Sequence, residues 1–270
     1  MKILWVKPVL PYPPHQGTRR VSLQILRTLA REHEVHLFTR LLWPREAGQV
    51  DGLRAAVPGL RVTAPLAPNR RSPLHRAAYR AAVAWWARRG RPPVESYTCL
   101  PELLRAFRDL RDQITPDLIV AEYWYAAAYL EGSGSVPTVL FAHDIECEAR
   151  AVREAVSQEP ARGRWLDLEA RREARALQHS RRSWYLTPRD RDAAVARFGV
   201  DDSRASIMPY AVDVHGDLAP RGAGDPPEDP DQVLLFGSFA ADFNVDALRF
   251  TLESVWPALR AGRPQTRLVI

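Results

Sequence analysis

Short apolar runs alternate with longer segments of helical periodicity along the chain. In residues 22–33, Leu23, Leu26 and Ala30 recur at the spacing of one helix face. Strands that alternate with helices are typical of βαβ units, and continuous apolar runs such as VLFA and LLFG indicate strands buried on both faces. We therefore expect an α/β protein with a parallel sheet, strands at 2–7, 34–40, 60–64, 117–122, 138–143, 183–187, 205–210, 232–237 and 266–270, and helices at 22–33, 74–90, 100–113, 145–158, 162–180, 189–198 and 244–261.

A proline- and glycine-rich segment divides this pattern in two. Residues 213–231 have four prolines, three glycines and almost nothing to bury, so we interpret them as a linker. It follows a first domain of residues 1–212 and precedes residues 232–270, which hold one strand–helix–strand unit. Two parallel strands and one helix cannot cover both faces of a sheet. We expect the second domain to be incomplete and the chain to be truncated.

Composition narrows the protein class. With 46% hydrophobic and 26% charged residues, the chain is neither wholly disordered nor collagen-like. Two cysteines, Cys99 and Cys147, make no disulfide framework and no CxxC spacing, which favours a reducing compartment. The sequence has no signal-peptide pattern and no apolar run near the ~20 residues of a membrane helix. We expect a cytoplasmic protein.

The net charge of +6 raises nucleic acid and anionic membrane as partners. Most arginines stand among acids on helical stretches, so the net charge alone does not identify a partner. Residues 52–94 differ, because they contain no acid and include a helical segment with Arg76, Arg80, Trp85 and Trp86. A basic helix with tryptophans suits an anionic membrane surface. The alternative is a helix packed on the sheet with an arginine-rich outer face, and nucleic-acid binding has no accompanying motif.

Ligands of open α/β sheets bind beyond the carboxyl ends of the strands. After the first strand, Gly17 and Thr18 stand just before a helix, where a bare backbone and free N–H groups suit an anion. The alternative is a turn glycine with Thr18 as helix cap. The sequence contains neither GxGxxG nor GxxxxGK[ST], so a dinucleotide or P-loop site is unsupported.

His143 and Asp144 follow another strand and open a helix. There they could contact a ligand hydroxyl or act in acid–base chemistry. The alternative is that Asp144 caps the helix and His143 is an ordinary loop residue. The other histidines show no metal-ligand spacing, and no GxSxG motif or reactive cysteine context occurs. We expect no metal site.

The segments together resemble one family. They are the PYPPHQGTRR loop, DLIVAEYWYAAAYL, VLFAHDIECEARA, WYLTPRDRDAAVARFG, IMPYAVDV and VLLFGSFAADFNVDALRF, in that order. The chain resembles a retaining glycosyltransferase of the GT-B fold, family 4. The resemblance implies a Rossmann-like acceptor domain followed by a Rossmann-like donor domain. Carried over by position, it assigns His143 to the donor-sugar side as the catalytic candidate, Gly17, Thr18, Gly237 and Asn244 to donor or phosphate loops, and Glu122, Tyr123 and Asp144 to the acceptor side.

The chain departs from the family pattern in three places. Gly17-Thr18 replaces the frequent paired glycines, and Tyr210-Ala211 replaces the usual Asn-Gly before Val-Asp. The Arg/Lys pair that clamps the diphosphate and the two glutamates spaced eight apart are not found. Because a departing nucleoside diphosphate needs its charge stabilised, we expect little or no transferase activity from these 270 residues alone.

The resemblance also implies substrates and a setting. The donor would be a UDP- or GDP-sugar and the acceptor a saccharide or lipid-linked saccharide, in cell-surface glycan synthesis at the inner face of the membrane, with no nucleic acid involved. Three alternatives stay open. The chain could be an acceptor-binding subunit that works with a separate donor-domain chain, the remnant of an interrupted gene, or part of a sugar-nucleotide epimerase.

Overall fold

The computed structural model describes residues 1–67, 73–157, 163–210, 229–237, 239 and 242–270. The chain divides into two compact units, Met1–Val212 and Asp213–Ile270. Most of the expected linker, residues 213–228, lies outside the described residues. Within the described part of the chain, no helix is both long and apolar enough to cross a bilayer.

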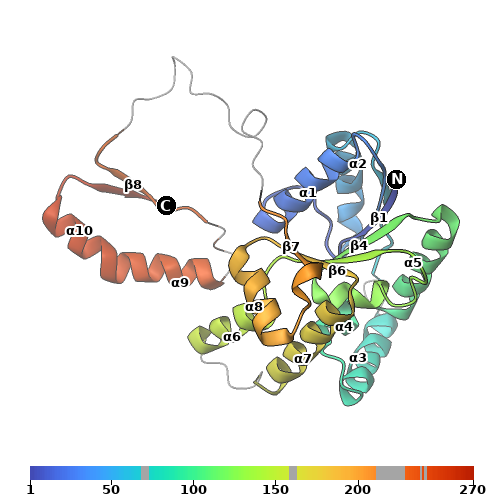
Figure 1. Ribbon diagram of the computed structural model, residues 1–270. Coiled ribbons are helices and arrows are strands. Elements are labelled where there is room, and N and C mark those ends of the chain that lie inside the picture. Colours follow the sequence, from blue (N-terminus) through green and yellow to red (C-terminus); the bar gives the residue numbers. More distant parts are fainter. Residues whose placement is uncertain (68–72, 158–162, 211–228, 238, 240–241) are drawn as a thin grey trace. The chain divides into compact units, whose positions relative to one another are not determined.

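A seven-stranded parallel sheet forms the centre of the first unit (Figure 1). Its strand order is β3-β2-β1-β4-β5-β6-β7. The chain moves outward from β1 to β2 and β3, then returns to the other side of β1 for β4, so the order reverses between β1 and β4. The strands are β1 Lys2–Val6, β2 Glu34–Phe38, β3 Arg61–Thr63, β4 Leu118–Glu122, β5 Thr138–Ala142, β6 Arg182–Tyr185 and β7 Ala205–Ile207.

Helices cover both faces of this sheet, with α1 and α2 on one side and α5, α7 and α8 on the other (Figure 1). This arrangement confirms the expected α/β fold with a doubly covered parallel sheet. The helices are α1 Gly17–Leu29, α2 Ala47–Ala56, α3 Pro73–Arg88, α4 Pro93–Thr98, α5 Pro101–Ile114, α6 Glu146–Ser157, α7 Gly163–His179 and α8 Pro188–Phe198, with short helical turns η1 Pro44–Glu46, η3 Trp124–Tyr129 and η5 Asp202–Arg204.

The alternation of side chains along β1 supplies both halves of the core. Ile3 and Trp5 pack on the α1/α2 side, whereas Leu4 and Val6 pack on the opposite side. Successive side chains of a strand point to opposite faces, so a strand buried on both sides reads as one continuous apolar run. All five residues of β5 are buried for the same reason.

The sequence pattern did not predict α2. Its sequence, AGQVDGLRAA, contains two glycines that weaken the helical signal. Tertiary packing explains Gly52, because a Cβ atom there would lie 2.5 Å from Cε1 of Tyr12. Helix α4 was missed as well, since six residues are too few to show a period.

The second unit contains β8 Gln232–Leu234 and β9 Arg267–Val269, which pair in parallel. The connection between them is helical, with α9 Asp242–Phe250, a π-helical turn η6 Thr251–Val255 and α10 Trp256–Gly262. This is one βαβ unit. Many of its large apolar side chains are exposed, among them Phe236 at 84%.

Two leucines provide a matched test of the core. Leu103 of α5 is 1% exposed, whereas Leu74 of α3 is 82% exposed. We expect Leu103→Ala to lower the free energy of unfolding by about 2–5 kcal/mol, through lost burial and the cavity that remains. Leu74→Ala should change it by less than about 0.5 kcal/mol. Urea unfolding of the full chain, followed by circular dichroism, measures both, and equal effects would contradict the assignment of α5 to the core.

Candidate functional site

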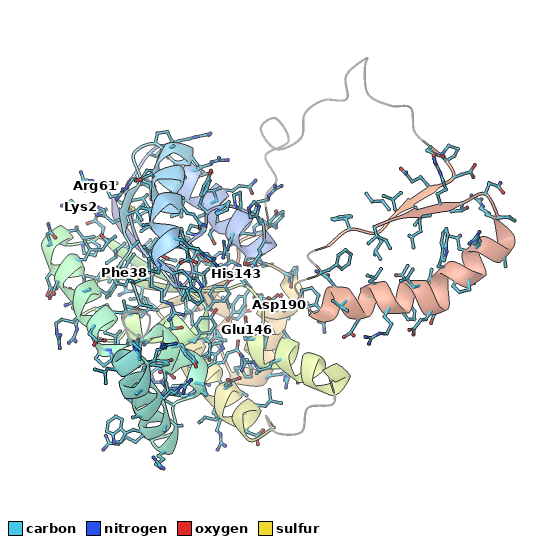
Figure 2. All side chains as sticks on the ribbon, turned by 180° about the vertical axis from the view of Figure 1, so that it is seen from behind. Lys2, Phe38, Arg61, His143, Glu146 and Asp190 are labelled. Carbon is cyan, nitrogen blue, oxygen red and sulfur yellow. The ribbon has the colours of Figure 1, made fainter. Side chains whose placement is uncertain are left out.

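Three chemically active side chains meet where the strand order reverses. Lys7 directly follows β1, Glu122 is the last residue of β4, and His143 directly follows β5. Strands β1, β4 and β5 are neighbours, so their carboxyl ends lie side by side at one edge of the sheet. Figure 2 shows His143 inside the first unit, whereas Lys2 and Arg61 lie at its rim. In open α/β sheets this crevice is where ligands bind.

The carboxylate of Glu122 is fully buried and accepts four hydrogen bonds. Its Oε1 atom lies 2.6 Å from Trp5 Nε1. Its Oε2 atom lies 2.5 Å from Lys7 Nζ, 2.7 Å from Ser22 Oγ and 2.7 Å from His143 Nε2. The donors come from β1, from the residue after it, from α1 and from the residue after β5. The carboxylate thus ties the end of β4 to three other segments: β1 with the residue after it, α1 and the residue after β5.

Burial by itself would raise the pKa of Glu122, because a carboxylate loses its hydration in the interior. The charge of Lys7 and the hydrogen bonds from His143 and Lys7 outweigh this effect and lower the pKa to about 2. Glu122 is therefore ionised at neutral pH. Its role as a contact for the acceptor substrate stays a prediction. The four hydrogen-bond donors to its carboxylate all come from the protein.

A column of rings lies against His143. The Tyr123 ring stacks on the imidazole with centroids 4.6 Å apart, and Tyr125 stacks on Tyr123 at 5.1 Å. The Thr18 side chain hydrogen-bonds the Tyr123 phenol, whose pKa is raised by burial. Tyr123 has φ 70° and ψ 142°, a region that is nearly restricted to glycine and costs on the order of 1–3 kcal/mol. Such strain is typical of functional sites.

The start of α1 is electropositive. Helix α1 begins at Gly17 with Gln16 at its N-cap and no side-chain cap, so the alternative in which Thr18 caps the helix is wrong. Its first turn contains no acid, and the buried Nε of Arg19 has no hydrogen-bond partner in the described part of the chain. A Cβ atom at Gly17 would meet nothing within 4 Å, so the backbone there is open to a ligand. Free N–H groups and unpaired positive charge suit an anion.

Asp144 is exposed and does not hold the start of α6. The N–H groups of Glu146 and Cys147 instead donate to the two carboxylate oxygens of Glu173 on α7, at 2.8 and 2.9 Å. Burial raises the pKa of Glu173 to about 7, since these two N–H donors compensate it only in part. Glu173 thereby fixes the segment that follows His143.

Arg40 lies beyond the end of β2 with its guanidinium among tyrosines. Its Nε donates to the backbone oxygen of Pro8 at 3.1 Å, and its Nη1 donates to the backbone oxygen of Tyr97. No carboxylate pairs with it among the described residues, and burial lowers its pKa. Tyr125, which stacks on Tyr123, is one of its neighbours. Arg40 is therefore a cation without a carboxylate partner close to the ring column.

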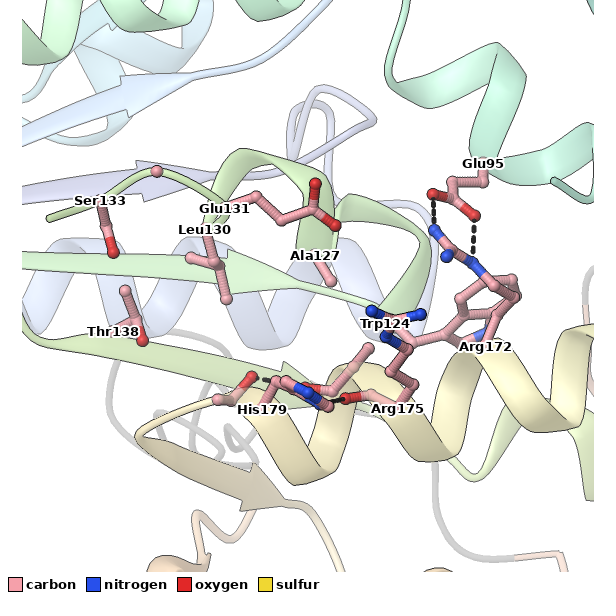
Figure 3. Close-up of a pocket in the computed structure, with 13 residues that line it drawn as sticks. Glu95, Trp124, Ala127, Leu130, Glu131, Ser133, Thr138, Arg172, Arg175 and His179 are labelled. Carbon is pink, nitrogen blue, oxygen red and sulfur yellow. Dashed lines mark hydrogen bonds and ion pairs between the residues drawn. The ribbon is translucent and has the colours of Figure 1, made fainter. Parts of the chain in front are cut away.

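A separate cavity of about 430 Å³ lies between η3 and α7. Figure 3 shows its wall, where Arg172 makes two hydrogen bonds to Glu95 and Arg175 and His179 follow along α7. The cavity extends to Thr138, the first residue of β5, and so reaches toward the opposite edge of the sheet from His143. It does not include any of the residues expected to form the site.

The remaining expected residues lie on other surfaces. Arg76 and Arg80 are exposed on α3, and Trp85 is 49% exposed with the Arg89 guanidinium 3.9 Å from its ring centroid. Trp86 is half-buried beneath Arg91. In the second unit, a Cβ atom at Gly237 would lie 3.1 Å from the Asn244 side chain, so these two residues are neighbours there.

The structure thus brings Thr18, Glu122, Tyr123 and His143 together. Lys7, Trp5 and Ser22 were not predicted from the sequence, although one signal was present for Lys7. It is one of only two lysines and directly follows an apolar strand, where the strand-end rule looks for ligand contacts. Trp5 and Ser22 carried no such signal, because their neighbours form an ordinary strand and an ordinary helix.

A sequence model described as Glycosyltransferase Family 4 matches residues 15–215. The match covers most of the chain, including Thr18, Glu122, Tyr123 and His143 of the candidate site, whereas Trp5 and Lys7 lie before it. The chain belongs to Glycosyltransferase Family 4. No curated protein sequence matches it significantly. Among the described residues of this family member, no group of three or more His, Cys, Asp and Glu side chains is placed to hold a metal ion.

Solved structures similar to this family 4 chain include glycosyltransferases of the GT-B fold. Sucrose-phosphate synthase from Thermosynechococcus elongatus is 16% identical, with TM-score 0.50 over 77% of this chain and 48% of that one. The spinosyn rhamnosyltransferase SpnG, complexed with thymidine diphosphate, is 16% identical, with TM-score 0.47 over 100% of this chain and 65% of that one. UGT2 from Phytolacca americana is 13% identical, with TM-score 0.47 over 77% of this chain and 53% of that one.

At these identities the likeness to the synthase shows the fold alone, and it confirms the expected Rossmann-like, GT-B-type architecture. The chain spans about half the length of that synthase.

Glu173 gives the chain a predicted pH dependence. Native Glu173 keeps its proton to about pH 7, whereas in the unfolded chain it loses the proton near the ordinary 4.5. Unfolding therefore releases a proton in this window, and stability should fall as pH rises from 4.5 to 7, by roughly 3 kcal/mol. We expect Glu173→Gln to remove this slope, as measured by urea unfolding at a series of pH values. The exposed Glu32→Gln is the control, and a slope that survives in Glu173→Gln would contradict the prediction.

Proposed function

We propose that the first unit binds the reacting sugar and phosphate groups in glycosyl transfer, at the carboxyl ends of β1, β4 and β5. The observation that carries the proposal is the buried Lys7–Glu122–His143 group at the point where strand order reverses. Ligands of open α/β sheets bind at this point. Membership of Glycosyltransferase Family 4 supports sugars as the ligands.

The donor in this proposal is a UDP- or GDP-sugar. Its diphosphate would lie at the start of α1, where Gly17 leaves the backbone open and Nε of Arg19 has no hydrogen-bond partner among the described residues. Charge-assisted hydrogen bonds to phosphate are among the stronger polar contacts in proteins. His143 would face the donor sugar, as the family resemblance implies, and the reaction would retain the anomeric configuration.

The acceptor in this proposal is a saccharide or lipid-linked saccharide of cell-surface glycan synthesis. Tyr123, with Asp144 at the exposed start of the next segment, would lie on the acceptor side. Arg40, which has no carboxylate partner among the described residues, suits a phosphate of a lipid-linked acceptor.

The second unit, in this proposal, begins a donor-binding domain, with Gly237 and Asn244 in its first loop. One βαβ unit with exposed phenylalanines leaves apolar surface for further strands and helices to cover. The 270-residue chain alone would then transfer sugar slowly or not at all. The alternative is an acceptor-binding subunit that works with a separate donor-domain chain, and a remnant of an interrupted gene is a third possibility.

Arg19→Ala tests the proposed phosphate contact. We expect the chain to bind UDP-glucose or GDP-mannose and the variant to bind about tenfold more weakly, because a charged hydrogen bond contributes on the order of 1.5–3 kcal/mol. Titrations followed by amide NMR shifts detect even weak binding. Arg31→Ala, an exposed arginine just after α1, is the matched control.

Two results would count against the proposal. Nucleotide-sugars and saccharides that shift no resonance near Gly17 or His143 would overturn the site. Rapid release of nucleoside diphosphate by the 270-residue chain would overturn its dependence on a donor domain.

We further propose that α3 contacts an anionic membrane face, which would place the enzyme at the inner surface of the membrane. Changing Arg76, Arg80, Trp85 and Trp86 to Ala should lower binding to phosphatidylglycerol vesicles by at least about tenfold, since each arginine contributes about 1 kcal/mol near such a surface. Co-sedimentation measures this binding. The control removes two exposed arginines of α5, Arg105 and Arg108. Equal binding by all three proteins would remove the membrane contact.

A further inference from the structure

We propose that Glu122 and Lys7 are positioning residues that hold the proton of His143 on Nε2, so that Nδ1 accepts a hydrogen bond from a ligand hydroxyl. The assignment of that hydroxyl to a sugar rests on the proposed function. The protonation of the ring does not, because it follows from the contacts of three side chains.

The first step concerns which nitrogen carries the proton. His143 Nε2 lies 2.7 Å from Oε2 of Glu122, and the same oxygen accepts hydrogen bonds from Lys7 and Ser22. An ionised carboxylate has no proton to donate. The Nε2 atom must therefore be the donor in this contact and must carry the ring proton.

The second step concerns the charge of the ring. Lys7 and Glu122 are 1% and 0% exposed at their side chains and balance one another. Neither Lys7 nor His143 pairs with a second carboxylate in the described part of the chain. A doubly protonated imidazole would add a buried positive charge without a counterion, which is costly in a desolvated site. The ring is therefore neutral, and Nδ1 is a bare acceptor.

The third step concerns what Nδ1 can bind. Nδ1 is buried and has no hydrogen-bond partner among the described residues. Phe141 and Tyr123 hold the ring, with centroids 4.4 and 4.6 Å from that of the imidazole. A buried acceptor without a donor is unfavourable, so a donor that reaches it after a local movement of the covering groups is bound selectively. A hydroxyl supplies such a donor, whereas an ionised phosphate oxygen does not.

Long-range ¹H–¹⁵N correlation spectra of the full chain test the assignment, because they distinguish protonated from bare ring nitrogens. The His143 signals are identified by their loss in His143→Asn. We expect Nε2 to be protonated and Nδ1 to be bare at pH 7. A proton on Nδ1 in the unsubstituted chain, or on both nitrogens, would overturn the proposal whether or not any variant folds.

Two substitutions should change the ring in opposite ways. In Glu122→Leu no acceptor faces Nε2 and the Lys7 ammonium remains as a donor beside it, so we expect the Nε2 proton to be lost in favour of Nδ1. In Lys7→Met the balancing cation is missing, so we expect protonation of both nitrogens. The double variant should return the ring to its neutral form. Glu131→Leu, at an exposed glutamate, is the matched control and should leave the signals unchanged. An unchanged ring in a folded Glu122→Leu variant would show that the carboxylate does not hold the proton on Nε2 and would overturn the proposal.

Two probes test the ligand class. Methyl α-glucopyranoside should shift the Nδ1 resonance on binding, whereas inorganic pyrophosphate should leave it in place. A saccharide that binds elsewhere without moving Nδ1 would overturn this inference and leave the proposed function intact. If neither saccharides nor nucleotide-sugars bind, the proposed function is overturned. The protonation of the His143 ring is tested separately, by the ¹H–¹⁵N spectra of the chain without ligand.

Discussion

The buried carboxylate of Glu122 is the constraint on which the site depends. A charge without access to water must be compensated from within, and here four donors do so. Because these donors belong to β1, α1 and the segment after β5, the network fixes the mutual position of three elements. The same bonds that stabilise the charge determine where His143 points. Fold and candidate chemistry therefore share one set of contacts.

Most of the fold follows from patterns within the sequence. A strand such as β1 sends Ile3 to one core and Leu4 to the other, so its continuous apolar run is a direct consequence of the doubly covered sheet. Helix α2 could not be predicted from the local pattern. Its Gly52 leaves room for the ring of Tyr12, which lies 40 positions earlier in the sequence. Local patterns report local burial and not a contact with a distant side chain.

The site was predictable to the extent that topology determines it. The rule that ligands bind at strand ends selected His143, Thr18 and their neighbours before the strand order was known. It could not show that Glu122 is enclosed by donors, since Trp5 and Ser22 come from segments that look purely structural. Nor could it show that Glu173, 27 residues beyond Glu146, holds the start of α6. Such pairings depend on tertiary packing.

Two buried glutamates show how partners, and not burial, decide the state of a charge. Glu122 and Glu173 are 0% and 1% exposed, yet their pKa values move in opposite directions, to about 2 and about 7. Glu122 has a full positive charge at 2.5 Å, whereas Glu173 has two backbone N–H dipoles. The first stays ionised throughout the physiological range and can orient a ring permanently. The second titrates near neutrality, and it holds the start of α6, three residues after His143. Any effect of pH on this part of the site should therefore act through the helix and leave the Lys7–Glu122 pair unchanged.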